Sequence, residues 1–250
     1  MAPLHASAQH AEDTISGASL HLRIRHRIYE TEHLAKDLRK RFAGDDKDHE
    51  DWKLERDYQL KDVAVRLKEF MFDESYAAAF QNVPAQAQRP SIGFIVAGYS
   101  GDGDLAEEYR IDIAGNGQCT GPTLLRQPTE VGLTWSGMPE PITRLVKGYS
   151  GMFAQVLVGI GLQQPQIDSI MKAAEALQLP FVSPAMPIQD AIDLAAFLVD
   201  LTINSSRFLP GAPVVGGPIE IAAITKHEGF KWVRRKHYFP AELNPKTEEE

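Results

Sequence analysis

The chain has 250 residues, 43% of them hydrophobic and 24% charged, which is the composition of a globular protein large enough for a substantial core. Its formal net charge of -8 argues against nucleic acid and anionic membranes as partners, because both are bound through basic surfaces. A single cysteine, Cys119, excludes an intrachain disulfide and a thiolate metal cage. Since there is no signal-peptide pattern and no long apolar run, the sequence predicts a cytoplasmic protein, with no motif for a cofactor.

The first part of the chain predicts two helices after an unstructured start. Residues 1–19 have few large apolar side chains and are expected to be a disordered tail. Residues 20–28 alternate like a strand, but a longer stripe of apolar residues at helical spacing favours a helix that continues to about Phe42. Gly44 and the acidic residues that follow it predict an exposed turn. Apolar residues recur at helical spacing from Leu60 to Met71, which predicts a second, amphipathic helix.

Strands are predicted in the middle and at the end of the chain. Ile92–Ala97 is an apolar run bounded by glycine, and Tyr109–Ile113 follows it across a short turn, so the two are expected to form an antiparallel hairpin. A third strand is expected near the end of residues 124–135. Residues 219–225 and 230–233 alternate again and predict another hairpin.

Helices are predicted between these two groups of strands. Residues 138–180 are expected to form shorter helices interrupted by glycine and proline. Pro187 can open a long helix that continues to about Phe208, because its missing N–H would have no partner in the first turn. Residues 240–250 predict a disordered acidic tail. The whole order indicates an α+β fold in which helices cover antiparallel strands, as one domain over residues 20–239.

Three stretches of the chain carry a resemblance to a known family. The first is the apolar run that ends in Ala97-Gly98-Tyr99, followed after a glycine-containing turn by Tyr109-Arg110-Ile111-Asp112. The second is Trp135-Ser136-Gly137 ahead of a helix, and the third is Met186-Pro187 at the start of the long helix with Val215-Gly216-Gly217-Pro218 after it. In this order and spacing they resemble the proteasome β-subunit group of N-terminal-nucleophile (Ntn) hydrolases, most closely its simpler bacterial members.

The resemblance implies a fold, an assembly and a chemistry. The fold is a four-layer αββα sandwich of two antiparallel sheets between helices, and the assembly is a homo-oligomeric ring that degrades proteins or peptides in an internal chamber. The chemistry is that of a threonine protease, in which the hydroxyl of an N-terminal Thr attacks the peptide carbonyl and its own α-amine accepts the proton. The family's turn positions near the site correspond to Ser136, Gly137, Gly216 and Gly217.

The sequence departs from this family at the nucleophile. In the family, a group of strands that carries the catalytic Thr, Lys and Asp precedes the first helix, and no such group is recognised ahead of Leu20, so we expect an N-terminally truncated member. Thr14 is the only threonine in front of the helices, and it follows Asp13 rather than the glycine usual at the cleavage point. Thr14 is therefore a weak candidate for the nucleophile.

A second departure lies in the late turn. The family commonly has an Asp and a Ser there that support the nucleophile, whereas the corresponding residues of this chain are Ala212 and Val215. Gly216 and Gly217 are then expected to serve a tight turn at positive φ rather than catalysis.

Other motifs favour structural interpretations. His26, Glu30 and His33 would share one helix face, but basic neighbours make a solvated face the better interpretation than a metal site. The glycines between Gly98 and Gly103 suit a hairpin turn rather than a phosphate loop, because a strand and not a helix follows them. Ser100 and Ser150 both lie in Gly-Tyr-Ser-Gly, which does not match a nucleophile elbow.

These observations lead to one functional hypothesis and two alternatives. The hypothesis is a proteasome-like subunit without catalytic activity that works within a ring. The first alternative is an active threonine endopeptidase whose N-terminus lies upstream of Met1, and the second is a binding module unrelated to proteolysis.

Overall fold

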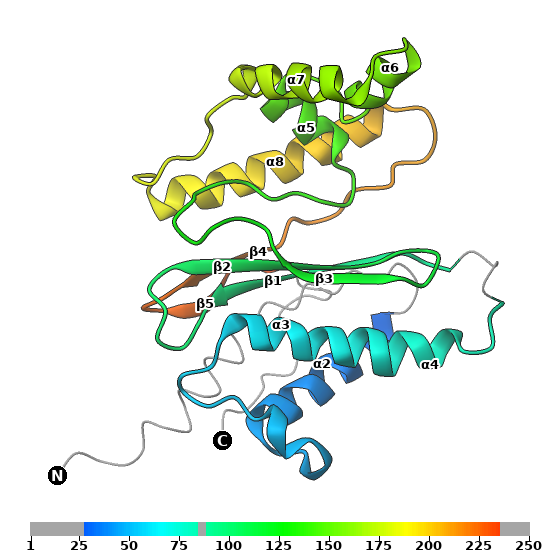
Figure 1. Cartoon of the computed structure of the whole chain (residues 1–250). Coiled ribbons are helices and arrows are strands. Elements are labelled where there is room, and N and C mark those ends of the chain that lie inside the picture. The colour runs from blue at the N-terminus through cyan, green and yellow to red at the C-terminus, as the bar shows by residue number, and fades with distance from the viewer. Residues whose placement is uncertain (1–27, 85–88, 236–250) are drawn as a thin grey trace. The chain divides into compact units, whose positions relative to one another are not determined.

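The computed structural model describes residues 28–84 and 89–235. The predicted tails, residues 1–19 and 240–250, and the strand-like residues 20–27 lie outside this part of the chain. The described residues form helices and two small antiparallel sheets, which confirms the predicted α+β class (Figure 1). They divide into two compact units: unit 1 contains the residues up to Glu130 and Ala222–Lys231, and unit 2 contains Val131–Ile221 and the residues from Trp232 onward.

The three-stranded sheet of unit 1 has the order β1-β2-β3, with β1 at Ile92–Tyr99, β2 at Ala106–Ile113 and β3 at Cys119–Leu124. The predicted hairpin is confirmed, since β1 and β2 pair antiparallel without a register shift. Phe94 pairs with Ile111 and Val96 with Tyr109, and all four side chains are buried. Successive side chains of a strand point to opposite faces, so these four define the face of the sheet that lies in the core.

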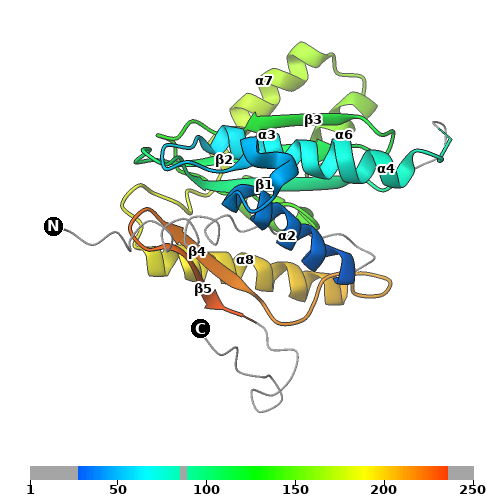
Figure 2. The ribbon, with the colours of Figure 1, turned by 90° about the horizontal axis from the view of Figure 1, so that it is seen from below.

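Helices cover that face of the sheet. α3 (Leu60–Lys68) contacts all three strands and lies along them (Figure 2), and its apolar residues Leu60, Val63 and Leu67 are buried. The chain continues through the π-helical η2 (Glu69–Tyr76) into α4 (Ala77–Phe80), so the helical segment begins where predicted but extends beyond Met71. Burial of this apolar stripe against the sheet contributes to the stability of unit 1.

A further helix precedes α3. α2 (Ile28–Ala43) ends within one residue of the predicted boundary, and Leu38 and Phe42 from its last turns join the core of unit 1. The short 3-10 helix η1 (Lys47–Trp52) follows, and Trp52 stacks with Phe42 at 6.1 Å between ring centroids. The predicted exposed turn after Gly44 is therefore partly helical and is anchored by a buried indole.

The predicted position of the third strand is wrong. β3 is Cys119–Leu124, directly after β2, whereas residues 125–139 form no strand. The tight connection is made by Asn116 and Gly117: the Asn116 side chain accepts a hydrogen bond from the Gln118 N–H, and Gly117 has φ +82°. Gly121 and Pro122 inside β3 interrupt the apolar alternation, which is why the pattern of this strand was not recognised.

Unit 2 is built around a long helix. α8 (Ile188–Phe208) follows Pro187 and ends at Phe208, which confirms the predicted helix. The shorter helices predicted between residues 138 and 180 are also confirmed, as α5 (Glu140–Lys147), α6 (Phe153–Gly159), α7 (Gln164–Ala174) and the single turn η3 (Glu175–Leu177). Ile142 and Val146 of α5 and Leu198 of α8 form a buried cluster, against which Trp135 and Phe181 pack.

The end of the described chain is a hairpin of β4 (Ile221–Thr225) and β5 (Gly229–Arg234). This confirms the predicted hairpin, although β4 begins two residues later than the alternation of the sequence indicated. The turn is closed by the Thr225 hydroxyl, which accepts a hydrogen bond from the Glu228 N–H.

Candidate functional site

The most buried polar cluster of unit 1 joins the end of β1 to the start of α3. Ser100 is 5% exposed, and its hydroxyl oxygen accepts a hydrogen bond from the Leu60 N–H at 3.0 Å, so it satisfies one of the free donors at the helix N-terminus. The same hydroxyl donates to the Glu107 carboxylate at 2.5 Å, and the Tyr109 hydroxyl donates to the other oxygen of that carboxylate at 2.8 Å. Ser100, directly after β1, and Tyr109 of β2 thus converge on the Glu107 carboxylate, and Ser100 links this pair to the N-terminus of α3.

The electrostatics of this cluster keep its hydroxyls protonated. Burial, together with the hydrogen bond to Glu107, raises the pKa of Tyr109 to about 12. Burial and the negative charge of Glu107 also raise the pKa of Tyr58, whose hydroxyl donates to the Tyr99 carbonyl at 2.8 Å. The Ser100 hydroxyl is only 5% exposed and is bound on both sides, by the Glu107 carboxylate and by the Leu60 N–H, so its oxygen is not open to a substrate. The cluster is therefore a structural clamp.

The glycine turn between β1 and β2 is part of the same region. A Cβ on Gly101 would lie 2.0 Å from the Arg56 carbonyl oxygen, and the Gly101 N–H donates to the Tyr58 carbonyl at 2.8 Å. Lys226 closes the turn from the other side, donating to the Gly103 carbonyl at 2.5 Å and to Asp104 at 2.6 Å. The hairpin interpretation of these glycines is confirmed, and their role is close backbone packing.

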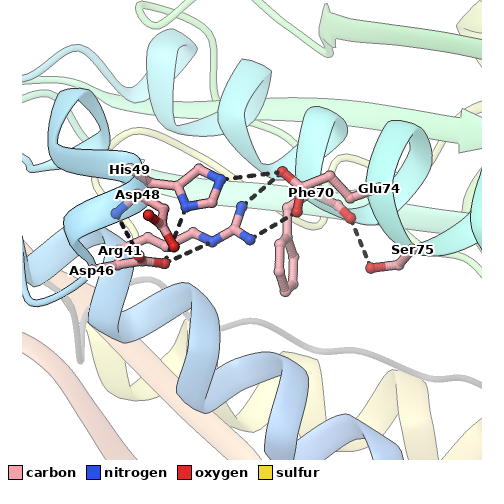
Figure 3. Close-up of polar contacts among 7 residues, drawn as sticks. All are labelled: Arg41, Asp46, Asp48, His49, Phe70, Glu74 and Ser75. Atoms are coloured by element: carbon pink, nitrogen blue, oxygen red, sulfur yellow. Dashed lines mark hydrogen bonds and ion pairs between the residues drawn. The ribbon is translucent and has the colours of Figure 1, made fainter.

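A second polar cluster surrounds Arg41 at the end of α2 (Figure 3). The Arg41 guanidinium donates two hydrogen bonds to Glu74, at 2.7 and 2.8 Å, and forms an ion pair of 3.5 Å with Asp46. His49 lies between the same two carboxylates, with Nδ1 at 3.1 Å from Asp46 and Nε2 at 3.9 Å from Glu74. The guanidinium also stacks over the ring of Trp52, 4.9 Å from its centroid.

This Arg41 cluster was missed in the sequence, because its members are up to 33 residues apart and belong to four different segments. A hydrogen bond from the Asp48 N–H, and the neighbouring His49 and Arg41, hold the pKa of Asp46 below its usual range. An open hollow of about 370 Å³ lies beside it, lined by three acidic and three basic residues: Asp37, Lys40, Arg41, Asp45, Asp46 and Lys47. The charges of the Arg41 cluster are paired with one another. The cluster is therefore better explained as a contact that holds α2 against η2 than as a ligand site.

The four predicted turn residues lie in unit 2, two of them before α5 and two after α8. Thr14 lies outside the described residues. Ser136 and Gly137 precede α5, where the Trp135 indole N–H donates to the Thr143 hydroxyl at 3.0 Å. Gly137 has φ +90°, so it needs the left-handed conformation that glycine adopts without strain.

The other predicted pair lies in the turn after α8, which the Ser206 hydroxyl holds by donating to the Val215 carbonyl at 3.0 Å. The expected positive φ is confirmed at Gly217, which has φ +90°, and is wrong at Gly216, for which the described backbone is not in that region. Space is not the constraint at either position, because an added Cβ would meet nothing within 4 Å. Gly217 serves the turn, as predicted, through its backbone conformation.

The buried hydroxyls of the described residues all have structural partners. Besides Ser100, the buried serine and threonine hydroxyls are those of Thr143, which accepts from an indole, Thr202, which donates to the Leu198 carbonyl, and Ser206, which holds the turn after α8. None of them is paired with a histidine or lysine in the described part of the chain. Cys119 is not activated either, since burial raises the pKa of its thiol.

The described residues contain neither a metal-binding cluster nor a helix suited to a membrane span. Residues 28–84 and 89–235 bring no three His, Cys, Asp or Glu side chains together as a metal site would require. His26 lies outside the described residues, as do the side chains of Glu30 and His33, so the interpretation of their helix face as solvated stays a prediction. Among the described helices, none combines the length and apolar character that a membrane span needs.

Comparison of the chain with protein-family models, with curated proteins and with solved structures found no match.

Proposed function

We propose that this chain is a proteasome-like subunit that contributes to an assembly for protein breakdown without supplying the nucleophile itself. From the family resemblance of the sequence, the proposal takes the fold, an Ntn αββα sandwich, and the assembly, a ring of like subunits. Its role in this proposal is structural: it presents surfaces to neighbouring subunits.

One observation carries the proposal: the motif residues of the resemblance pair with one another. The apolar run of the first half, residues 94–96 of β1, pairs with residues 109–111 of β2, and Ala97-Gly98-Tyr99 continues the same uninterrupted antiparallel register opposite residues 106–108. The two halves of the motif are ten residues apart in the sequence and are adjacent in the sheet. Because register is set by the turn and the buried face together, this pairing supports the proposal that the two halves of the motif form one strand pair, as in the family.

The order of the elements supports the same proposal. Two helices, a group of antiparallel strands, several helices and a final hairpin follow one another in the described residues. The long helix α8 begins after Met186-Pro187, and the Gly216-Gly217 turn comes between α8 and the last hairpin. The resemblance assigns these two positions to the Met186-Pro187 motif and to the Gly216-Gly217 motif.

We propose that the chain does not hydrolyse peptides because of the residues found at the positions that catalysis would use. The buried serine and threonine hydroxyls of the described residues serve structural hydrogen bonds, and the late turn has Ala212 and Val215 where the family has an Asp and a Ser. Thr14 follows Asp13, so the candidate lacks the usual cleavage point. Ser100, the buried hydroxyl that donates to a carboxylate, is only 5% exposed, and the other buried serine and threonine hydroxyls of the described residues have no acidic or basic side chain as a partner to activate them.

The purified full chain tests the proposal in two measurements. Electron microscopy reports whether it forms ring-shaped particles, and fluorogenic peptides with and without a threonine-directed inhibitor report activity. We expect rings and no turnover. The Thr14→Ala variant is the control: turnover that both the inhibitor and this substitution abolish would replace the structural role by an active threonine peptidase. A particle of the mass of one chain would overturn the subunit proposal and favour the separate binding module.

A further inference from the structure

The turn between β2 and β3 contains the pair Asn116-Gly117. An asparagine followed by glycine is prone to deamidation, because glycine has no side chain to hinder the attack of its backbone nitrogen on the asparagine side chain. The asparagines of the chain are Asn82, Asn116, Asn204 and Asn244. Only Asn116 precedes a glycine, and its side chain is exposed to the water that the reaction needs.

Deamidation of Asn116 would proceed in two balanced steps. The Gly117 amide nitrogen loses its proton to solvent and forms a bond to the Asn116 Cγ, while the bond from Cγ to the side-chain nitrogen breaks and ammonia leaves with a proton. Water then opens the cyclic imide at one of its carbonyls. Opening at the side-chain carbonyl gives aspartate, and opening at the main-chain carbonyl gives isoaspartate, in which the backbone runs through the former side chain. Water is the only reactant that the chain does not supply.

The fold requires both residues of this pair. The Asn116 Oδ1 accepts a hydrogen bond from the Gln118 N–H at 3.0 Å, which stabilises the turn. Gly117 has φ +82°, and a Cβ at this position would lie 2.8 Å from Arg89 Nη1. Replacement of either residue by a less reactive one would therefore cost a turn contact or strain the backbone. The structure thus keeps a reactive pair at an exposed turn.

The closed turn holds the reacting groups in hydrogen bonds. The Gly117 N–H donates to the Ala114 carbonyl at 2.8 Å, and the Asn116 side-chain nitrogen donates to Gln118 Oε1 at 2.9 Å. Attack needs the Gly117 nitrogen free, so the first of these bonds must break. An exposed turn opens at a lower free energy than the buried part of a sheet. We infer that Asn116 is a site of spontaneous deamidation whose rate the closed turn restrains, an inference that is independent of the proposed function.

The two products should differ in their effect on β3. Aspartate keeps the side-chain oxygen that accepts from the Gln118 N–H, so the turn can persist. Isoaspartate adds a methylene to the backbone between β2 and β3. Cys119 follows directly and pairs with Ile113, and the register of a hairpin depends on the length of its turn. Isoaspartate should therefore displace the start of β3 and make the partly buried Cys119 thiol more accessible.

Mass spectrometry of tryptic peptides tests this inference on the full chain. The chain is incubated at mildly alkaline pH, once folded and once in urea, and a sample taken at the start corrects for deamidation during digestion. Peptide 111–126 contains Asn116 and no other asparagine. Peptide 173–207 is the internal control, because Asn204 lies in α8 and its side-chain nitrogen donates to Asp200.

We expect the mass gain of an amide-to-acid exchange in peptide 111–126 and not in peptide 173–207 of the folded chain. The reaction of the folded chain should be at least about tenfold slower than that in urea, because only the opened turn reacts. An unmodified peptide 111–126 in the folded chain, over a time in which the urea sample reacts, would overturn the site. Equal rates in the two samples would overturn the restraint by the turn.

A brief treatment of the aged, folded chain with a thiol reagent tests the effect on β3. Peptide 111–126 contains both residue 116 and Cys119, so one peptide reports the product and the labelling together. Asn116→Asp identifies the aspartate form by its chromatographic retention. We expect the isoaspartate form to be labelled faster than the aspartate form, and equal labelling would contradict the displacement of β3.

Discussion

Removal of the Ser100 hydroxyl should destabilise unit 1, whereas the same change at Ser150 should have little effect. Both serines lie in Gly-Tyr-Ser-Gly, and both form a hydrogen bond with a glutamate. Ser100 accepts a hydrogen bond from the Leu60 N–H at 3.0 Å, and Ser150 accepts one from the Met152 N–H at 3.1 Å. They differ in burial, because Ser100 is 5% exposed and Ser150 is only half-buried. Burial decides whether water can replace the lost partner.

The expected magnitude follows from the bonds that Ser100→Ala would break. Loss of a helix cap costs about 1 kcal/mol. The Leu60 N–H and one oxygen of Glu107 would also be left without their partner in a buried environment, at about 1–3 kcal/mol. Since these two costs overlap at the Leu60 N–H, we expect a loss of about 2–3 kcal/mol in the free energy of unfolding. Ser150→Ala should cost about 0.5–1 kcal/mol, because solvent reaches its partners.

Urea unfolding followed by circular dichroism measures the two free energies. Hydrogen exchange of the peptide that contains α3 assigns the loss to unit 1, because the cap acts on the first turn of that helix. Equal losses for the two variants, within about 0.5 kcal/mol, would refute the reasoning that the buried cluster around Glu107 clamps α3 to the sheet.

Three further substitutions test other contacts of the fold. Arg41→Lys should lower the free energy of unfolding by about 1–2 kcal/mol, because it loses the paired hydrogen bonds to Glu74 and the stacking on Trp52. Arg144→Lys, at an exposed i,i+4 pair, is the control and should cost less than about 0.5 kcal/mol in the same urea assay. Tyr109 has a raised pKa, so its protonated hydroxyl stabilises the fold below pH 10 and this contribution is lost as the pH rises towards about 12; Tyr109→Phe should flatten the fall in stability over that window. Gly101→Ala should prevent normal packing of the turn and lower the melting temperature, whereas Gly216→Ala should leave it within about 2 °C, and similar melting temperatures would contradict the close approach at Gly101.

Elements with a regular local pattern were predicted well from the sequence. The start of α3 at Leu60 and the extent of α8 follow from apolar residues at helical spacing and from a proline that suits a first turn. The β1–β2 hairpin follows from a short apolar run, a glycine turn and a second alternating run. In each of these elements the residues that decide the conformation lie within one short stretch of chain.

Elements whose conformation depends on distant partners were predicted poorly. β3 has Gly121 and Pro122 where a strand pattern should continue, and it is a strand because its backbone pairs with β2. The helical segment after α3 continues beyond Met71 through η2, whose buried residues Phe70 and Tyr76 pack into the core that the sheet provides. Local propensity predicts neither β3 nor the continuation of the helix through η2, because the free energy that stabilises both comes from tertiary packing.

The polar clusters show the same division. The sequence by itself determined the class of the fold, the positions of its main helices and strands, and the residues that carry the resemblance to the proteasome β-subunit group. Only the tertiary structure decided that Ser100 caps a helix 40 residues earlier and that Arg41 pairs with a carboxylate 33 residues later. Hydrogen bonds of this kind form only after the chain brings distant segments into register, so no local pattern in the sequence contains them.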